Sequence, residues 1–551
     1  MDQKTLIGFI LIGAILLFWP TYLDFISPEP DKKGQTTPTE VVVSAEEPQT
    51  LEPVVGLESP ANVSDNISTV ITPLFTAGVS NKNGGSLNSF LVNDHLKKTE
   101  SSLDLIDASN QNNLLVSFIN QSGEEIFLNQ NWSEVHSNLG EKNTVALSKN
   151  NPTTTLTYVL EVGGKKITKD LTFKYDSYEV VVNTNLRNIK GAILDGNFRL
   201  DWLGGLPLTE PSQDSMFLEG LVGQGGDIES FRAGSSGIFG SSSATIEKST
   251  KQFTGIAEFA GYRTKYFGVF FVPQKTNFVE LTKYSLNDRA AVDIITSQNI
   301  NFDQTVIYLG PLEYDRVSGL NVGIEEKILG WQWLSSVSWL VYSIMILMYS
   351  LIPNYGVVVI LFAVFIKTIT YPLMAKQLRS SKKMQEINPL LNNIKNKYKN
   401  NPTLQQQKIA ALFQEHKINP LAGCLPMLIQ MPVLMSVFMV FRNTIEFRGE
   451  SFVFWINDLS AADTLLMVGN IPLNVLPFLM SASMFYTMQA GMASQPSGGD
   501  PAQEATQKMM KYMFPGMMFF LFYGFPSGLN LYYLCFNMMQ IAQQKIINKE
   551  A

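Results

Sequence analysis

The sequence has little charge and almost no cysteine. Only 16% of its 551 residues are charged, against roughly 25% in an ordinary soluble protein, which argues against a single soluble domain. A hydrophobic content of 45% excludes a disordered chain, and a net charge of −7 argues against a nucleic-acid-binding protein. The two cysteines, Cys424 and Cys535, both lie late in the chain, so residues 1–330 contain no disulfide.

The shortage of charge is uneven along the chain. Residues 331–551 contain 16 Lys and Arg against 9 Asp and Glu, whereas the first 330 residues contain 25 against 39. Of the 22 methionines, 20 follow Gly330. The composition therefore indicates an acidic water-soluble part followed by a basic apolar part that lies in a membrane.

Residues 71–325 lack any pattern typical of a catalytic or metal site. His95 and His136 have no Cys or His neighbours at metal-ligand spacing. The Gly/Ser-rich stretch 234–243 lacks the Gly-Lys-Ser/Thr ending of a phosphate-binding loop, so it is interpreted as a surface loop. We interpret this part as a binding or scaffolding module without a metal or other cofactor.

The chain begins with an apolar run, Thr5 to Leu23, that is long enough to cross a bilayer. We interpret residues 1–26 as a retained transmembrane anchor, because no small-x-small cleavage site follows Leu23. A cleaved signal peptide is the alternative. Residues 27–70 form an acidic tether rich in Pro, Thr and Ser, which lacks the apolar content to fold.

Residues 71–325 are predicted to form an antiparallel β-sandwich. Leu171, Phe173 and Tyr175 alternate with polar residues, which is the period of a half-buried strand. Similar short runs lie at 178–182, 266–272 and 305–309, and Gly, Asn and Ser turns separate them.

Charge predicts the topology of the apolar part. Residues 376–422 contain nine basic and two acidic residues and should be a cytoplasmic helical hairpin, divided at Asn400-Asn401-Pro402. Residues 326–352 are interpreted as an interfacial amphipathic helix, because a second crossing there would place that basic loop on the side of the acidic domain. The five predicted spans of the core, residues 353–551, are about 355–375, 423–441, 471–492, 512–525 and 528–547.

Lys367 lies near the middle of the first of these spans. A charge at the bilayer centre costs about 2.5–3.5 kcal/mol on insertion scales, so an ionisable residue there indicates function, with snorkelling to the surface as the alternative. Residues 423–443, 471–492 and 512–548 contain no Asp or Glu, so no carboxylate in these segments can pair with it. We therefore expect water or a visiting substrate to stabilise the charge.

Polar residues also recur on one face of the last span. Asn530, Tyr533, Asn537, Gln540 and Gln544 follow 3-4-3-4 spacing, and Gln430 adds another amide at membrane depth. The pattern favours a polar groove, and hydrogen bonding between helices is the alternative. The basic hairpin is either a docking surface or a solvated face; its candidate residues are Lys382, Lys383, Lys395, Lys397 and Lys399.

Several motifs resemble the YidC-type membrane protein insertases (the YidC/Oxa/Alb family), in the Gram-negative form with a large periplasmic domain. The motifs occur in the family's order: Tyr308-Leu-Gly-Pro311, Lys395-Asn-Lys-Tyr-Lys399, Ile418-Asn-Pro-Leu-Ala-Gly-Cys-Leu-Pro426, Leu428-Ile-Gln-Met-Pro432, residues 452–460 and Phe525-Pro-Ser-Gly-Leu529.

The resemblance implies a periplasmic β-supersandwich, an interfacial helix and five spans around a hydrophilic groove. It also implies an inner-membrane insertase and folding chaperone that acts on nascent proteins, alone or with the Sec translocon and its accessory subunits. From this resemblance we expect a protein that is not an enzyme and needs no cofactor. Membrane lipids are expected partners and DNA is not. The groove's positive residue corresponds to Lys367, where most bacterial relatives carry Arg, and the long basic ribosome-binding tail of some relatives is missing, so ribosome contact should be weak.

Two other classes of protein stay open. A secondary transporter is disfavoured because a proton relay normally needs a membrane carboxylate or histidine. A membrane assembly scaffold without a working groove would tolerate apolar residues in place of Lys367 and the polar face of the last span.

Overall fold

The computed structural model describes residues 64–97, 100, 102–106, 112–135, 143–214, 216–233, 247–286, 289–330, 332–399, 401–416, 425–469, 471–492 and 501–550. They form two compact units that meet in sequence between Glu325 and Glu326, called here the β unit and the helical unit. The predicted anchor (1–26), most of the tether, His136 and the Gly/Ser loop at 234–243 lie outside the described residues.

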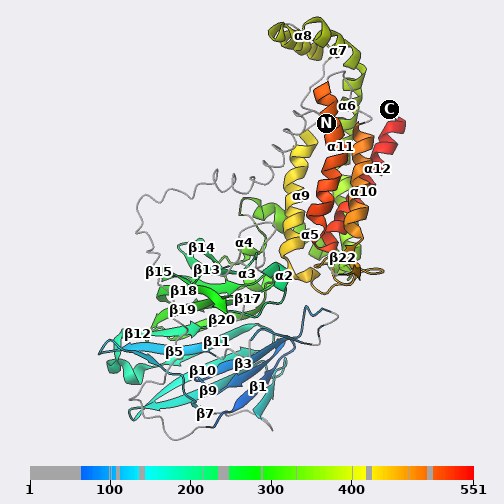
Figure 1. Ribbon diagram of the computed structural model, residues 1–551. Helices are drawn as coiled ribbons and strands as arrows, with labels where there is room; N and C mark the ends of the chain where they lie inside the picture. The colour runs from blue at the N-terminus through cyan, green and yellow to red at the C-terminus, as the bar shows by residue number, and fades with distance from the viewer. Residues whose placement is uncertain are drawn as a thin grey trace. The chain divides into compact units, whose positions relative to one another are not determined.

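The β unit is built from three sheets (Figure 1). A nine-stranded sheet has the order β14-β13-β16-β17-β20-β11-β10-β9-β7, a six-stranded sheet β15-β18-β19-β12-β5-β6, and a five-stranded sheet β4-β3-β2-β1-β8. The strand pairings between described residues are antiparallel except that of β1 with β8. A predominantly antiparallel β-sandwich is therefore present, as predicted.

The strands have the following bounds. The nine-stranded sheet contains β7 Ser133–Val135, β9 Thr153–Val162, β10 Lys165–Lys174, β11 Glu179–Asn185, β13 Glu219–Gln224, β14 Asp227–Arg232, β16 Phe259–Arg263, β17 Phe267–Pro273 and β20 Gln304–Pro311. The six-stranded sheet contains β5 Asn113–Asn120, β6 Glu125–Phe127, β12 Ile193–Trp202, β15 Ser249–Ala257, β18 Thr276–Leu286 and β19 Arg289–Asn299. The five-stranded sheet contains β1 Ile67–Ile71, β2 Phe75–Ser80, β3 Ser86–Val92, β4 Leu103–Asp104 and β8 Thr144–Ala146.

One face of the nine-stranded sheet covers both smaller sheets. Phe173 packs on Phe75 of the five-stranded sheet, with ring centroids 6.4 Å apart, and Phe271 packs on Trp202 of the six-stranded sheet at 6.3 Å. The register pairs Phe173 with Val180, Val180 with Ile307 and Ile307 with Phe271, so these side chains share a face. The core of the β unit lies between this face and the two smaller sheets.

Lys169 is buried where the three sheets meet. It lies on β10 two residues before Leu171 and so points to the same core face. Its ammonium donates hydrogen bonds to the backbone carbonyl of Asn83, between β2 and β3, at 3.1 Å, and to that of Leu114 on β5. Burial lowers the pKa of Lys169 from 10.5 to about 7. The lysine thus joins the three sheets through backbone groups.

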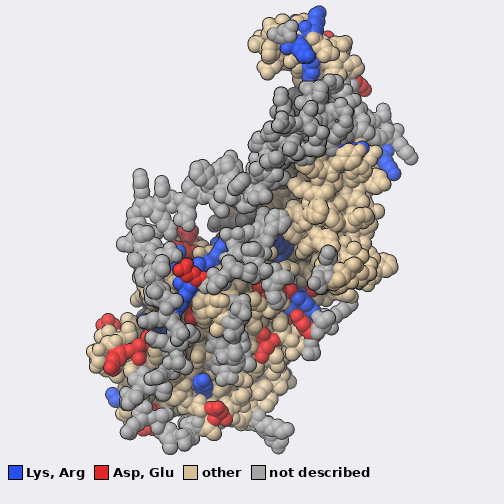
Figure 2. Space-filling view, viewed as in Figure 1, with Lys and Arg blue, Asp and Glu red and all other residues tan. Residues whose placement is uncertain are grey.

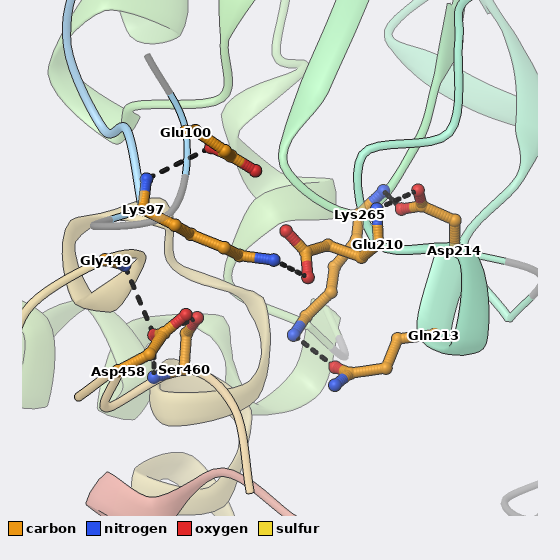
Figure 3. Close-up of polar contacts among 9 residues, drawn as sticks. All are labelled: Lys97, Glu100, Glu210, Gln213, Asp214, Lys265, Gly449, Asp458 and Ser460. Atoms are coloured by element: carbon orange, nitrogen blue, oxygen red, sulfur yellow. Dashed lines mark hydrogen bonds and ion pairs between the residues drawn. The ribbon is translucent and has the colours of Figure 1, made fainter. Parts of the chain in front are cut away.

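Polar contacts within each unit are visible in Figure 3. In the β unit, Lys97 pairs with Glu210 at 2.7 Å, and the carboxylate of Asp214 accepts the backbone N–H groups of Glu210 and Lys265. In the helical unit, the carboxylate of Asp458 accepts the backbone N–H groups of Gly449 and Ser460. These bonds fix loops rather than forming a reactive site.

The helical unit contains the predicted core. Its helices are α4 Glu325–Ile328, which spans the boundary between the units, α5 Ser335–Leu351, α6 Tyr355–Glu386, α7 Asn388–Lys397, α8 Pro402–Glu415, α9 Leu425–Asn443, α10 Leu476–Met492, α11 Pro501–Phe522 and α12 Ser527–Glu550. A short hairpin, β21 Thr464–Val468 and β22 Ile471–Asn474, precedes α10. Among the described helices, the segment Tyr355–Ala375 of α6 is long and apolar enough to cross a membrane, and α5 is apolar but shorter.

Helices α6 and α12 run in the same direction. Phe362 packs on Tyr532, with ring centroids 6.1 Å apart, and further along both helices Met374 and Ala375 pack in one cluster with Ile547. Because residue numbers rise in the same direction along both helices from one contact to the next, the two helices are parallel. By contrast, α10 and α11 are antiparallel, because Phe478 contacts Phe519 while Phe485 contacts Tyr512.

The backbone hydrogen bonding of helix α6 is interrupted just after Lys367. Pro372 lies inside the helix and lacks an N–H, so the carbonyl of Thr368 loses its usual partner. The hydroxyls of Thr368 and Thr370 donate to the carbonyls of Val364 and Ile366, each at 2.8 Å, a pattern that bends helices.

The structure contradicts two predicted boundaries, and a third predicted span overlaps a helix that begins well before it. Residues 67–70, assigned to the tether, belong to strand β1. Residues 471–474, assigned to a span, form β22, because Gly469 adopts φ +63° and turns the chain back in a hairpin that hydropathy alone does not reveal. The fourth predicted span, 512–525, corresponds to a helix that begins at Pro501 and ends at Phe522.

Candidate functional site

Lys367 is buried between helices near the middle of α6. It lies 12 residues, or about 18 Å, from the start of that helix, and its side chain is 3% exposed. Its ammonium donates a hydrogen bond to the side-chain carbonyl of Gln540 on α12 and lies 3.4 Å from the ring centroid of Phe536. An amide dipole and an aromatic face therefore stabilise its positive charge.

Other amides of α12 surround this contact. The side chain of Gln543 donates a hydrogen bond to the backbone carbonyl of Lys367 at 2.9 Å. Gln543 and Gln544 are each 6% exposed, and their side-chain oxygens have no hydrogen-bond partner among the described residues. The parallel packing of α6 and α12 brings these amides to the depth of the lysine.

Helix α9 adds two polar groups with unused hydrogen-bonding capacity. Gln430 is half-buried and lies 13 residues, or about 20 Å, before the end of α9, so its depth is similar to that of Lys367. Its side-chain nitrogen and the hydroxyl of Ser436 are buried and have no hydrogen-bond partner within the described part of the chain. Buried polar groups of this kind can form hydrogen bonds with water or with a polar part of a bound molecule.

The polar face of α12 divides into two parts. Asn530 is fully buried and donates to the carbonyls of Phe522 and Phe525, at 3.2 and 3.4 Å, so it fixes the turn between α11 and α12. Asn537 donates to the hydroxyl of Ser483 on α10 at 3.2 Å. The alternative of hydrogen bonding between helices thus describes Asn537, and capping of a turn describes Asn530.

Tyr533 lies between these two parts. It is half-buried, and its ring packs edge-on against Phe522 with centroids 5.1 Å apart. Of the six residues predicted for the groove, the structure therefore brings Lys367 and Gln540 into contact. Asn530, Tyr533 and Asn537 make other contacts of the same bundle, and Gln430 has a buried side-chain nitrogen without a hydrogen-bond partner among the described residues.

Among the described residues, the partners of the Lys367 ammonium are Gln540 and Phe536. That water or a visiting substrate also stabilises its charge stays a prediction. Phe536 and Gln543 were missed. Both lie on the face of α12 that also carries Gln540, four residues before and three after it, so helical spacing from Gln540 could have found them.

The basic segment 376–422 contains the end of α6, which includes Lys382 and Lys383, and the two short helices α7 and α8. Asn401 caps α8 by accepting the N–H of Leu404, and Ile387 and Leu412 form the centre of a small apolar cluster. Figure 2 shows Lys and Arg side chains at this tip. Among the predicted docking residues, Lys383, Lys397 and Lys399 are exposed, Lys395 is half-buried, and the side chain of Lys382 lies outside the description.

The described part of the β unit contains no comparable site. No group of three or more His, Cys, Asp or Glu side chains that could hold a metal occurs among the described residues. His95 instead contacts the carboxylate of Glu313 at 2.9 Å, and Arg316 donates to the same carboxylate at 2.7 Å. Burial alone would raise the pKa of Glu313, but these two contacts hold it below its ordinary value.

Comparisons with known proteins cover both units. Residues 68–341 match the family model described as YidC periplasmic domain, and residues 347–551 match the model described as 60Kd inner membrane protein. Among solved structures, one described as an active YidC insertase with its first transmembrane domain resolved is 17% identical and covers 90% of this chain and 94% of its own, with a TM-score of 0.34.

Curated relatives match along the whole chain. The membrane protein insertase YidC of Chlorobaculum parvum is 31% identical over 100% of this chain and 94% of the relative. The protein of the same name from Chlorobaculum tepidum is 30% identical over 100% of this chain and 95% of the relative. With both family models matched in order, the chain belongs to the YidC family of membrane protein insertases.

Proposed function

We propose that the seam between α6 and α12 is the substrate groove of this insertase and that Lys367 is its positive contact. The observation that carries the proposal is a buried lysine whose described partners, Gln540 and Phe536, are both uncharged. A side-chain amide and a ring satisfy the ammonium less strongly than a carboxylate would, so an acidic group on a substrate can replace them.

The unused polar atoms beside the lysine support the same assignment. Gln543 and Gln544 on α12 and Gln430 and Ser436 on α9 each have a buried polar atom without a hydrogen-bond partner among the described residues. In a membrane such atoms are costly unless water or a polar guest meets them. Together they form a polar path that a hydrophilic flank of a nascent protein can follow.

Insertion then proceeds by lowering a barrier. A polar groove part-way into the bilayer shortens the hydrocarbon that the polar flank must cross, and the apolar segment of the substrate leaves sideways into lipid. The protein makes and breaks no covalent bond, and the proposal needs no cofactor. We assign a folding-chaperone role to the same contacts, because a partly inserted client occupies the groove.

The proposed topology places the basic hairpin in the cytoplasm and the β unit in the periplasm. Five spans cross the inner membrane, namely α6, α9, α10, α11 and α12, and α5 lies at the membrane surface. The net charge of +7 over residues 376–422 supports a cytoplasmic hairpin. The parallel direction of α6 and α12 also fits, because three crossings lie between them. In this topology a crossing by the N-terminal anchor puts the N-terminus in the cytoplasm, and the five crossings after the β unit put the C-terminus on the same side.

We further propose the partners of the cytoplasmic hairpin. Its exposed Lys383, Lys397 and Lys399 suit acidic phosphates of the ribosome and acidic segments of nascent chains. The Sec translocon is proposed as a second partner in the membrane, for clients too long or too charged for the groove alone.

Substitution of Lys367 tests the groove. Wild type and the variants Lys367→Arg, Lys367→Gln, Lys367→Ala and Lys367→Glu are reconstituted in proteoliposomes, and insertion of a one-span substrate is measured with an acidic or a neutralised flank. Lys367→Arg should retain activity, whereas Ala and Glu should impair insertion, most strongly for the acidic flank. If Lys367→Ala inserts both substrates as fast as wild type does, Lys367 has no role in the mechanism. If Lys367→Gln is fully active while Lys367→Ala is impaired, the groove must be polar but its charge has no role.

Thiol labelling tests the topology. In a background with Cys424→Ser and Cys535→Ser, single cysteines replace Lys383 and Lys399. A membrane-impermeant maleimide added to spheroplasts should leave both unlabelled until the membrane is permeabilised. Labelling of intact spheroplasts would contradict the cytoplasmic position of the hairpin.

A further inference from the structure

The β21–β22 hairpin is exposed although it is almost entirely apolar. Every residue of β21 is exposed, including Leu466 at 47%, Met467 at 58% and Val468 at 61%, and Leu473 of β22 is 43% exposed. The register pairs Leu466 with Leu473, so their side chains share one face. Both faces of β21 therefore present aliphatic side chains to the surroundings.

This hairpin is short and contains Pro472, but it lacks the charged side chains that commonly protect exposed strands. Residues 464–492 contain no Asp, Glu, Lys or Arg. Soluble proteins guard free sheet edges with charges, because a flat apolar edge in water pairs with other chains. An uncharged apolar hairpin of this kind indicates that it does not face bulk water.

A second exposed apolar group lies in the preceding loop. Phe454 is 90% exposed and adopts φ +59°, a conformation that is unfavourable for a bulky side chain. The next residue, Trp455, donates a hydrogen bond from its ring nitrogen to the carboxylate of Asp463 at 3.0 Å, which ties this loop to the start of the hairpin. The backbone is thus held so that an aromatic ring points away from the protein.

Hydrogen bonds fix the hairpin at the ends of the helices. The carboxylate of Asp463 accepts the N–H groups of Val475 and Leu476, at 2.9 and 2.6 Å, and so caps α10. Asn474 donates to the carbonyl of Tyr523 at 2.6 Å, just after α11, and the hydroxyl of Tyr523 donates to the carbonyl of Pro472. In Figure 1, β22 lies at the opposite end of the helices from α7 and α8.

We infer that the hairpin and Phe454 lie in the interfacial layer of the leaflet opposite the α7–α8 hairpin, in contact with lipid. The apolar surface continues without a charge onto α10, where Phe478 is 64% exposed. Free strand edges do not occur in hydrocarbon because their N–H and C=O groups need partners, so the hairpin belongs at the level of the lipid glycerol groups, where water still reaches its edges. The inference needs only the membrane location of the helical unit and is independent of the groove.

Spin labels at three positions test this placement. In the background without Cys424 and Cys535, full-length protein with Val468→Cys, Ile256→Cys or Ile369→Cys is labelled and reconstituted in phosphatidylcholine and phosphatidylglycerol vesicles. Ile256, on β15 of the β unit, is the matched control, since it is 64% exposed and also lies on a strand. Ile369, 58% exposed on α6, reports the membrane interior.

Collision rates with oxygen and with a water-soluble nickel chelate are compared. The oxygen-to-nickel ratio at 468 should lie clearly above that at 256 and below that at 369, and a label at Met467→Cys should behave like the one at 468. A ratio at 468 equal to that at 256 would place the hairpin in water and overturn the inference. Protection from both reagents would show that protein covers it, and would also overturn it. A water-like ratio at 369 would instead contradict the proposed topology.

Discussion

The two units each bury a lysine without a described carboxylate partner, but they hold it in different ways. Lys169 of the β unit donates to two backbone carbonyls, which cannot move without shifting the sheets. Lys367 of the helical unit contacts the side chains of Gln540 and Phe536, which can change rotamer while the helices stay in place. The two lysines are thus both buried but differ in the rigidity of their partners, and we propose that this difference leaves Lys367 accessible to a substrate.

The same substitution should lower the insertion rate at Lys367 and leave it unchanged at Lys169. Lys367→Met should lower the insertion rate of an acidic-flank substrate by about tenfold or more, equivalent to ~1.4 kcal/mol or more. Lys169→Met should leave that rate near wild type, because its site only joins sheets. Insertion into proteoliposomes measures both, and resistance of the β unit to limited proteolysis shows that each variant is folded. A comparable loss with folded Lys169→Met would show that insertion does not depend on Lys367 in particular.

A carboxylate placed beside Lys367 should hold its ammonium in place, as the backbone carbonyls of Asn83 and Leu114 hold that of Lys169. In Gln540→Glu the new carboxylate forms an ion pair with Lys367 and competes with acidic substrates. We expect insertion of acidic-flank substrates to fall several-fold while neutral-flank substrates change little. Gln540→Met is the control, since it removes the amide without adding charge. Equal effects of Glu on both flanks would show that the pair disrupts packing and not recognition.

The stability of the β unit should depend on pH through Lys169. Its pKa is about 7 when folded and 10.5 ordinarily, so between these values the unfolded chain binds the extra proton. The free energy of unfolding should therefore rise with pH above about 7, by up to about 1.4 kcal/mol per pH unit, and become independent of this group below 7. Asp214 and Asp293, whose pKa values burial raises to about 6, titrate below this window.

Denaturant unfolding of the full chain from pH 7.5 to 9.5, followed by fluorescence of Trp132 and Trp202, measures this slope. Both rings are buried in the β unit, so their signal follows that unit. Lys169→Met should reduce the slope, and an unchanged slope in that variant would assign it to other groups.

The smallest expected effect concerns the contact between α10 and α12. Asn537→Leu and Ser483→Ala should each weaken the helical unit slightly, with a coupling energy of about 0.6 kcal/mol in a double-mutant cycle, typical of hydrogen bonds within membranes. Unfolding in mixed micelles measures the cycle. A strong loss of insertion with little change in stability would instead assign Asn537 to the groove.

Much of the β unit could be predicted from the sequence because alternation is a local signal. The runs at 171–175, 178–182, 266–272 and 305–309 correspond to β10, β11, β17 and β20. The role of Lys169 could not be predicted, because its partners Asn83 and Leu114 come from two other sheets and expose their carbonyls through left-handed backbone conformations, with φ of +57° and +54°.

The site was predicted only as far as spacing and depth allow. Lys367 and Gln540 were identified from their positions along two helices, but their contact depends on which helices are neighbours and in which direction they run. The pattern of polar residues does not reveal Phe536, although an aromatic face also stabilises a cation. The β21–β22 hairpin was missed because hydropathy does not distinguish an apolar strand from an apolar helix.

The length of α6 has a mechanical consequence. Its 32 residues extend for about 48 Å, which is well beyond the thickness of bilayer hydrocarbon, about 30 Å, and the α7–α8 hairpin follows the end of this helix. One helix thus connects Lys367 to the α7–α8 hairpin, and Pro372 lies between them at a position where the helix can bend. A bend of α6 at Pro372 would therefore move the α7–α8 hairpin relative to Lys367 while the part of α6 before the proline stays in place.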